Sequence, residues 1–255
     1  MLRCLRDRVR ALLPAEAQLH HARTLSRAGR MAEALAIWTP LAEAGVARAQ
    51  TNLGACYATG AGLPVDLDAA RRWLQRGAEG GDTLGQRNLG SLLLPHDAAA
   101  AAGWYRRAAN GGDAESQDQL SRMLLTGEGL PQDAAEARLW AEAAARQGIA
   151  AAAARLGTMC HDAAGGPRDP LEAVRWWRVA AEAGDADSAA RLGAALHLGQ
   201  GIREDQTEAM AWLLVASGRH SVLVRPFFGR VRDRLTPEQL AAAEDMARGF
   251  GWVGR

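Results

Sequence analysis

The chain is 255 residues long, and 48% of its residues are hydrophobic although only 5% are aromatic, a composition that favours packed helices over a sheet. Its formal net charge is +1, which disfavours a general nucleic-acid binder. Three cysteines, Cys4, Cys56 and Cys160, are too few and odd in number to predict a disulfide framework. We find no apolar run long enough for a membrane span and no secretory signal, so we expect a cytoplasmic protein.

The first two segments differ from the rest of the chain. Residues 1–14 mix arginines with leucines and valine, which predicts a short basic amphipathic helix that caps the N-terminal end. A membrane-surface or targeting role is the alternative for this helix. Residues 15–46 predict a degenerate helix pair with a turn at Gly29. Pro40 should kink or shorten the second helix, because proline removes a helical hydrogen bond.

One pattern then occurs five times over residues 47–220, and its second copy is shortened. Each copy has an aspartate seven positions before a tryptophan, an alanine three before it and a small residue four after it. Each also has a leucine followed by a small residue further upstream. The tryptophans are Trp73, Trp104, Trp140, Trp176 and Trp212. Columns that keep the same phase over five copies predict stacked repeat units.

The copy at residues 49–82 predicts a pair of helices. An apolar stripe that ends at Tyr57 predicts a buried face on a first helix over residues 47–59. Glycines at 60 and 62 should end this helix, since glycine adopts left-handed conformations without penalty. Asp66 should then cap the second helix, whose small residues flank the ring of the tryptophan and let it lie in the groove of the next helix.

Two places depart from this pattern. The second copy lacks the paired glycines and keeps only Pro95 and His96 before its aspartate, so we expect a tighter turn. The repeat decays in residues 221–255, which we expect to form C-terminal capping helices. Residues 220–235 predict one more copy of the first helix of a repeat, with a bend at its start. Residues 236–239, Thr-Pro-Glu-Gln, predict a strong start for the helix that follows. Trp252 fits an end cap, with docking or self-association as the alternative.

The combination of Leu-Gly, a Gly-x-Gly loop, Asp, Ala and Trp, and a Gly-Asp turn resembles the Sel-one-like repeat, a relative of the tetratricopeptide repeat. The resemblance implies an all-α fold, an α/α superhelical solenoid of antiparallel helix pairs with about twelve helices and a C-terminal capping helix. It also implies a non-enzymatic scaffold for protein contacts. Some cysteine-rich members have been linked to β-lactam binding, so a hydrolase of the β-lactam or cell-wall type is an alternative. The paired cysteines of those members are absent from this sequence.

No group of residues predicts a catalytic, metal or cofactor site. The Gly-x-Gly loops follow helices rather than strands, unlike phosphate-binding loops. Cys160 and His161 are neighbours on a helix, so their side chains point in different directions, and Cys160 occupies a column that should be buried. His161 and His197 lie in adjacent repeats, about 10 Å apart by helix spacing, which is too far for a shared metal without other ligands. We therefore expect no catalytic residue, no metal and no cofactor.

The first helix of each pair predicts a partner-binding surface. In the related tetratricopeptide repeat, ligand contacts come from positions one and two before, and two after, the leucine of Leu-Gly. By analogy we expect a groove lined by Asn52, Arg87, Asn88, Gln119, Arg122, Arg155 and Arg191. Arginine binds carboxylates and amides bind a peptide backbone, so we expect an extended acidic segment of a protein or peptide partner. A solvated helix face and a regulatory nucleic-acid-associated protein are the alternatives.

Overall fold

The computed structural model describes residues 14–251, and within them the secondary structure is entirely helical. Of the predicted N-terminal helix only Pro14 is described, and Trp252 also lies outside the described residues. The α-helices are α2 (Ala15–Arg27), α3 (Met31–Glu43), α4 (Ala47–Thr59), α5 (Leu67–Glu79), α6 (Thr83–Leu93), α7 (Ala98–Asn110), α8 (Ala114–Thr126), α9 (Ala134–Arg146), α10 (Ala150–Asp162), α11 (Pro170–Glu182), α12 (Ala186–Leu198), α13 (Gln206–Gly218), α14 (Phe228–Arg232) and α15 (Pro237–Gly249), with a short 3-10 helix η1 (Val222–Val224).

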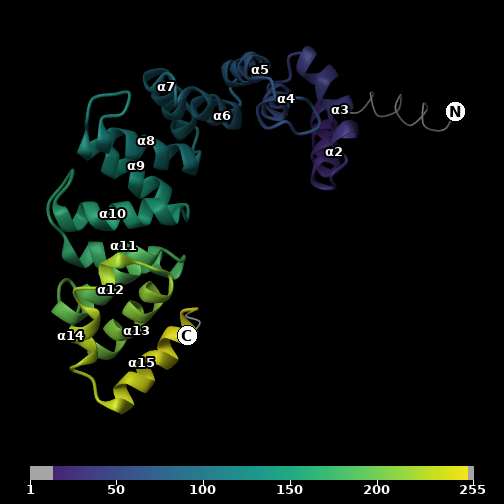
Figure 1. Ribbon diagram of the computed structural model, residues 1–255. Coiled ribbons are helices and arrows are strands. Elements are labelled where there is room, and N and C mark those ends of the chain that lie inside the picture. The colour runs from purple at the N-terminus through teal and green to yellow at the C-terminus, as the bar shows by residue number, and fades with distance from the viewer. Residues whose placement is uncertain (1–13, 252–255) are drawn as a thin grey trace. The chain divides into compact units, whose positions relative to one another are not determined.

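Within each of two compact units, the helices follow one another in chain order, as expected for helix pairs (Figure 1). In the first of two compact units, which holds residues up to Ser116 and Glu128–Leu130, each helix from α2 to α6 contacts the next. In the second unit, which holds Gln117–Gly127 and residues from Pro131 onward, the same is true from α9 to α13, and α15 packs on α13. The predicted all-α repeat fold is confirmed. We call the even-numbered helices from α2 to α12 the A helices and the odd-numbered helices from α3 to α13 the B helices.

The aspartate column caps the B helices as predicted. In each of the five copies the aspartate side chain accepts a hydrogen bond from the backbone N–H three residues later, which satisfies one of the free amides of the first turn. The bonds are Asp66 to Ala69, Asp97 to Ala100, Asp133 to Glu136, Asp169 to Glu172 and Asp205 to Glu208. The aspartates therefore set where the B helices from α5 to α13 begin.

The glycine of the Leu-Gly pair brings the two helices of a repeat close together. A Cβ atom at Gly54 would lie 2.8 Å from Cγ of Leu74, and one at Gly157 would lie 2.5 Å from Cδ1 of Trp177. Real Cβ atoms do not approach other atoms this closely. Glycine at this column therefore lets a large B-helix side chain pack directly on the A helix.

The second glycine of the inter-helix loop has a packing role that the sequence analysis missed. Gly165 has φ +73°, and a Cβ there would lie 2.0 Å from the carbonyl oxygen of Ala134, at the start of the preceding B helix. A Cβ at Gly201 would likewise lie 2.1 Å from the carbonyl oxygen of Pro170. These loops therefore rest on the preceding repeat, where no larger residue fits.

The tryptophan column is less buried than its flanking small residues suggest. Trp212 is buried, but the other four rings are half exposed. In α9, α11 and α13 the indole N–H donates to a glutamate four residues earlier, as from Trp140 to Glu136. In α5 and α7 a guanidinium lies over the ring instead, with Arg76 Cζ 4.9 Å from the Trp73 centroid. Tyr57 is likewise only half buried.

Pro40 does not shorten its helix. α3 is 13 residues long and continues past Pro40 to Glu43. The shortened second copy does tighten its turn, since the backbone N–H of Asp97 donates directly to the carbonyl of Leu93 at the end of α6.

The prediction of a last A helix over residues 220–235 is wrong. That segment forms η1 and the five-residue helix α14, with Arg225 and Pro226 between them. Proline lacks the N–H that a continuous helix would need at that point. α15 then begins as predicted, with a reciprocal capping box between Thr236 and Gln239.

Candidate partner-binding surface

The predicted A-helix columns separate into buried and half-exposed positions. Two positions before the leucine, Thr51, Asp118 and Ala190 are buried and cannot line an open groove. One position before the leucine, all five side chains are half exposed, and four of the five at two positions after it are too. The half-exposed residue before the leucine is Asn52 or Asn88 in the first unit, and Gln119, Arg155 or Arg191 in the second.

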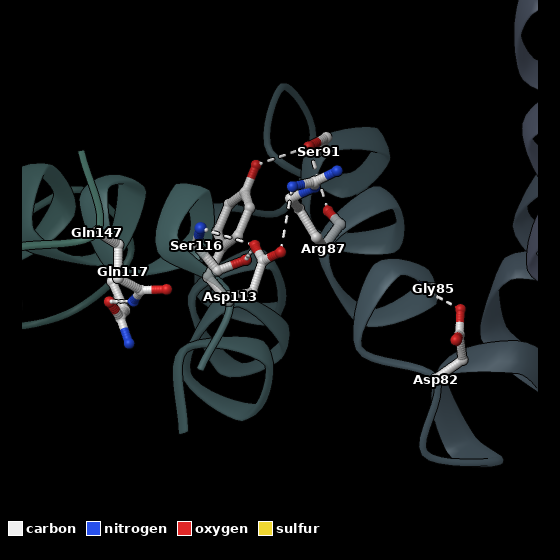
Figure 2. A network of polar contacts seen from close by, with 9 residues as sticks. Asp82, Gly85, Arg87, Ser91, Asp113, Ser116, Gln117 and Gln147 are labelled. Atoms are coloured by element: carbon white, nitrogen blue, oxygen red, sulfur yellow. Dashed lines mark hydrogen bonds and ion pairs between the residues drawn. The ribbon is translucent and has the colours of Figure 1, made fainter. Parts of the chain in front are cut away.

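Arg87 holds α6 to the aspartate that ends the same repeat. Its Nη1 lies 3.1 Å from Oδ1 of Asp113, at the start of the next A helix (Figure 2). The other carboxylate oxygen of Asp113 accepts from the backbone N–H and the hydroxyl of Ser116. Beside them, the hydroxyls of Ser91 and Tyr105 lie 3.0 Å apart. Arg87 therefore takes part in a network between repeats.

Arg155 has a similar role in the second unit. Its Nη1 makes an ion pair with Oδ1 of Asp118 on α8, and both side chains are mostly buried. Within the repeat of α8 and α9, Gln147 Nε2 donates to Gln117 Oε1 at 2.7 Å (Figure 2). Arg122 also bonds within its helix, where its Nε donates to Gln119 at 3.2 Å. These arginines contact their own chain before any partner.

Arg191 differs from Arg87 and Arg155. Within residues 14–251 it makes no ion pair, and its Cζ lies 5.9 Å from the ring centroid of Trp177. It stands at the edge of a pocket of about 320 Å³ formed by α10, α11, α12 and the segment around η1. The walls are mostly apolar, with Leu198, Val222 and Phe227 among them.

This pocket exists because the predicted last A helix does not form. The short segment from η1 to Phe227 covers α12 only in part, and it leaves Leu198 half exposed and Val222 60% exposed. The edge of the Phe227 ring faces His197, with centroids 6.2 Å apart. A break in the repeat pattern thus produces an apolar pocket beside an unpaired arginine.

Cys160 and His161 do not form a catalytic pair. Cys160 is fully buried as predicted, and burial raises the pKa of its thiol to about 11. Its Sγ lies 3.6 Å from Glu172, whereas Nδ1 of His161 lies 2.7 Å from Asp162. At neutral pH this thiol is protonated and weakly nucleophilic.

Among residues 14–251, no three His, Cys, Asp or Glu side chains gather in a metal-binding arrangement. Within the same residues, no helix is long and apolar enough to cross a membrane.

The comparison with protein families agrees with the repeat geometry. The sequence model of the Sel1 repeat matches residues 47–82, 84–113, 114–149, 150–185 and 186–217. The chain therefore belongs to the Sel1 repeat family. Repeats of this family commonly mediate protein–protein interaction. No curated protein matches the sequence.

Two solved structures share the fold. One is c5321 of uropathogenic Escherichia coli, described as a protective antigen with an SLR fold, which is 26% identical with a TM-score of 0.78. The match covers 92% of this chain but only 53% of that longer one. The other is a Sel1 repeat protein from Oxalobacter formigenes, 23% identical with a TM-score of 0.77, covering 91% of this chain and 99% of that one.

Proposed function

We propose that this protein is a non-enzymatic scaffold that binds an extended segment of a partner protein on its A helices. The observation that carries the proposal is the contrast between neighbouring columns of these helices. The leucines and small residues are buried, while the side chains just before the leucine stay polar and half exposed in every copy. Within each unit, accessible polar side chains at one position of successive A helices suit recognition of an extended chain.

The contacts of the predicted residues support different roles for them. Arg87 and Arg155 mainly stabilise the fold, since each has a carboxylate partner in its own chain. Asn52, Asn88 and Gln119 offer amides to a peptide backbone, and Arg191 offers a guanidinium without an ion pair. The hydrolase alternative lacks support, because burial keeps the Cys160 thiol protonated.

Arg191→Glu tests the proposal, with Arg175→Glu as its control. Arg175 is exposed on α11 and makes no ion pair within the described residues, so both variants change the charge equally. The natural chain and both variants are used to capture proteins from a lysate of the source organism, and captured proteins are then purified and titrated by calorimetry.

We expect to capture a protein that has equal affinity for the natural chain and the Arg175 variant. Its affinity for the Arg191 variant should be at least tenfold lower. Equal binding by all three forms would place the contact away from the second-unit A helices. Thermal unfolding of both variants checks that neither loses its fold.

A further inference from the structure

A second pocket lies in the first unit, and it is lined by hydrogen-bond donors. It has a volume of about 510 Å³ and is formed by α2, α3, α4 and the start of α6. Three arginines line it: Arg23 and Arg27 from α2, and Arg48 from α4. His20, Ser26 and Asn52 add polar groups, and Leu19, Trp38 and Leu84 add apolar surface. Among residues 14–251, no aspartate or glutamate lines this pocket.

Two of the arginines have no carboxylate partner. Arg23 and Arg27 are exposed, and neither makes an ion pair or side-chain hydrogen bond within residues 14–251. They stand four residues apart on α2, so their side chains share one face of the helix. Two like charges at this spacing repel each other slightly, and an anion between them removes that repulsion.

The third arginine, Arg48, uses only its Nε atom to bind its own chain. This Nε lies 2.5 Å from Oδ1 of Asp82, which also caps α6 by accepting from the backbone N–H of Gly85. Asp82 is buried, so it orients Arg48 without lining the pocket. The terminal nitrogens of Arg48 have no acceptor among the described residues, and they are the part of the guanidinium that binds carboxylates side by side.

A buried donor provides an independent sign of a missing acceptor. Trp38 is 5% exposed and lines the pocket, and its indole N–H has no hydrogen-bond partner in the structure. A buried N–H without a partner is unfavourable, and structures rarely keep one without a reason. The wall of this pocket therefore contains a buried donor that no described residue satisfies.

We infer that this N-terminal arginine pocket binds a segment with several carboxylates, supplied by the partner of the scaffold proposed above. Arg23, Arg27 and Arg48 hold carboxylates and Asn52 holds the backbone of the segment. The pocket is large enough for more than one side chain, and guanidinium groups match carboxylates in a planar, two-bond geometry. A nucleic-acid strand fits less well, because the large Trp38 ring is buried and offers no face for base stacking.

The test uses a fluorescein-labelled peptide of four Glu-Gly repeats, with four Gln-Gly repeats as the uncharged probe. The full-length chain is compared with Arg23→Gln/Arg27→Gln and with Arg71→Gln/Arg72→Gln. Arg71 and Arg72 are exposed on α5 of the same unit and make no ion pair, so the control removes the same charge from another face. Binding is measured by fluorescence anisotropy at two salt concentrations.

We expect the Glu-Gly peptide to bind at least tenfold more weakly to the pocket variant, and within twofold of the natural affinity to the control. We also expect high salt to weaken binding, since the contacts are ionic. The indole N–H resonance of Trp38, assigned with Trp38→Phe, should shift as the peptide is added. Equal affinities for the two variants, or an unmoved Trp38 resonance at saturation, would overturn the inference.

Competition identifies the bound chemistry. The Gln-Gly peptide, inorganic phosphate and a single-stranded oligonucleotide should each displace the Glu-Gly peptide poorly. Unlabelled Glu-Gly peptide serves as the reference competitor. If any of the three displaces the labelled peptide at the concentration at which the unlabelled Glu-Gly peptide does so, a carboxylate-specific pocket is contradicted. Failure here is distinguishable from failure of the scaffold proposal, because that proposal is tested with Arg191 in the other unit.

Discussion

Arginines on the A helices differ between two regions of the molecule. The guanidinium groups of Arg87 and Arg155 each make an ion pair with an aspartate that is distant in the sequence. In the N-terminal arginine pocket, Arg23 and Arg27 have no such partner within residues 14–251. Arginine therefore has two roles in this molecule. Arg87 and Arg155 stabilise the fold through ion pairs, whereas Arg23 and Arg27 are available to bind a ligand.

The largest expected loss of stability is at Gly165, where the preceding repeat leaves no room for a side chain. Gly165→Ala should lower the free energy of unfolding by about 3 kcal/mol, because the new Cβ collides with Ala134 and the residue keeps a positive φ. Gly148→Ala has a similar φ, +90°, with no atom within 4 Å, so only the backbone strain of about 1–2 kcal/mol applies. Urea unfolding measures both, and equal losses would contradict a collision at Gly165.

The second effect is slow alkylation of the buried Cys160 thiol. Burial raises the pKa of Cys160 from 9.0 to about 11, so at pH 8 its thiolate fraction is about a hundredfold lower than that of an ordinary cysteine. Alkylation by iodoacetamide should be slow at pH 8 and should accelerate as the pH rises toward 11. Mass spectrometry of the Cys160 peptide gives the rate, with the chain unfolded in guanidinium as the reference. Rapid labelling of the folded chain at pH 8 would show an activated thiol instead.

Removing a mostly buried ion pair should have the next largest effect. Arg155→Ala leaves Asp118, which is 9% exposed, without its cation, so we expect a loss of about 2 kcal/mol in the free energy of unfolding. Arg191→Ala removes an arginine without an ion pair and should cost less than about 0.5 kcal/mol. Chemical unfolding compares the two variants. Similar losses would erase the distinction between paired and unpaired arginines.

The smallest of these stability effects is expected at the more exposed pair. Arg87→Gln should cost about 1 kcal/mol, because its guanidinium is 28% exposed and water screens the pair with Asp113. Asp113 keeps its bonds to Ser116, so the start of α8 stays capped. Repeating the urea unfolding in high salt should shrink the difference from the natural chain. A difference that grows with salt would point to packing rather than charge.

Much of the fold follows from the sequence because it depends on local rules. The aspartates cap the B helices, Gly60 ends α4 with φ +75°, and Thr236 starts α15, each as the pattern predicts. These features involve residues close in the chain, whose hydrogen bonds fix each other's conformation. Family membership also followed from the phased columns.

The site could be predicted only in part, because partners between repeats are not local. The sequence shows Arg87 and Arg155 as accessible cations, but Asp113 and Asp118 reach them only after the helices stack. Arg23 and Arg27 were missed because the first helix pair departs from the repeat pattern. Their spacing of four residues on α2 was the available signal.

The most direct measurement compares two variants for both stability and binding. Arg155→Gln and Arg23→Gln/Arg27→Gln are each titrated with the labelled Glu-Gly peptide and unfolded in urea. We predict that the first variant loses stability and keeps its peptide affinity, while the second keeps its stability and loses affinity at least tenfold. If the first variant, still folded, loses the peptide as completely as the second, the division between structural and partner-binding arginines is contradicted.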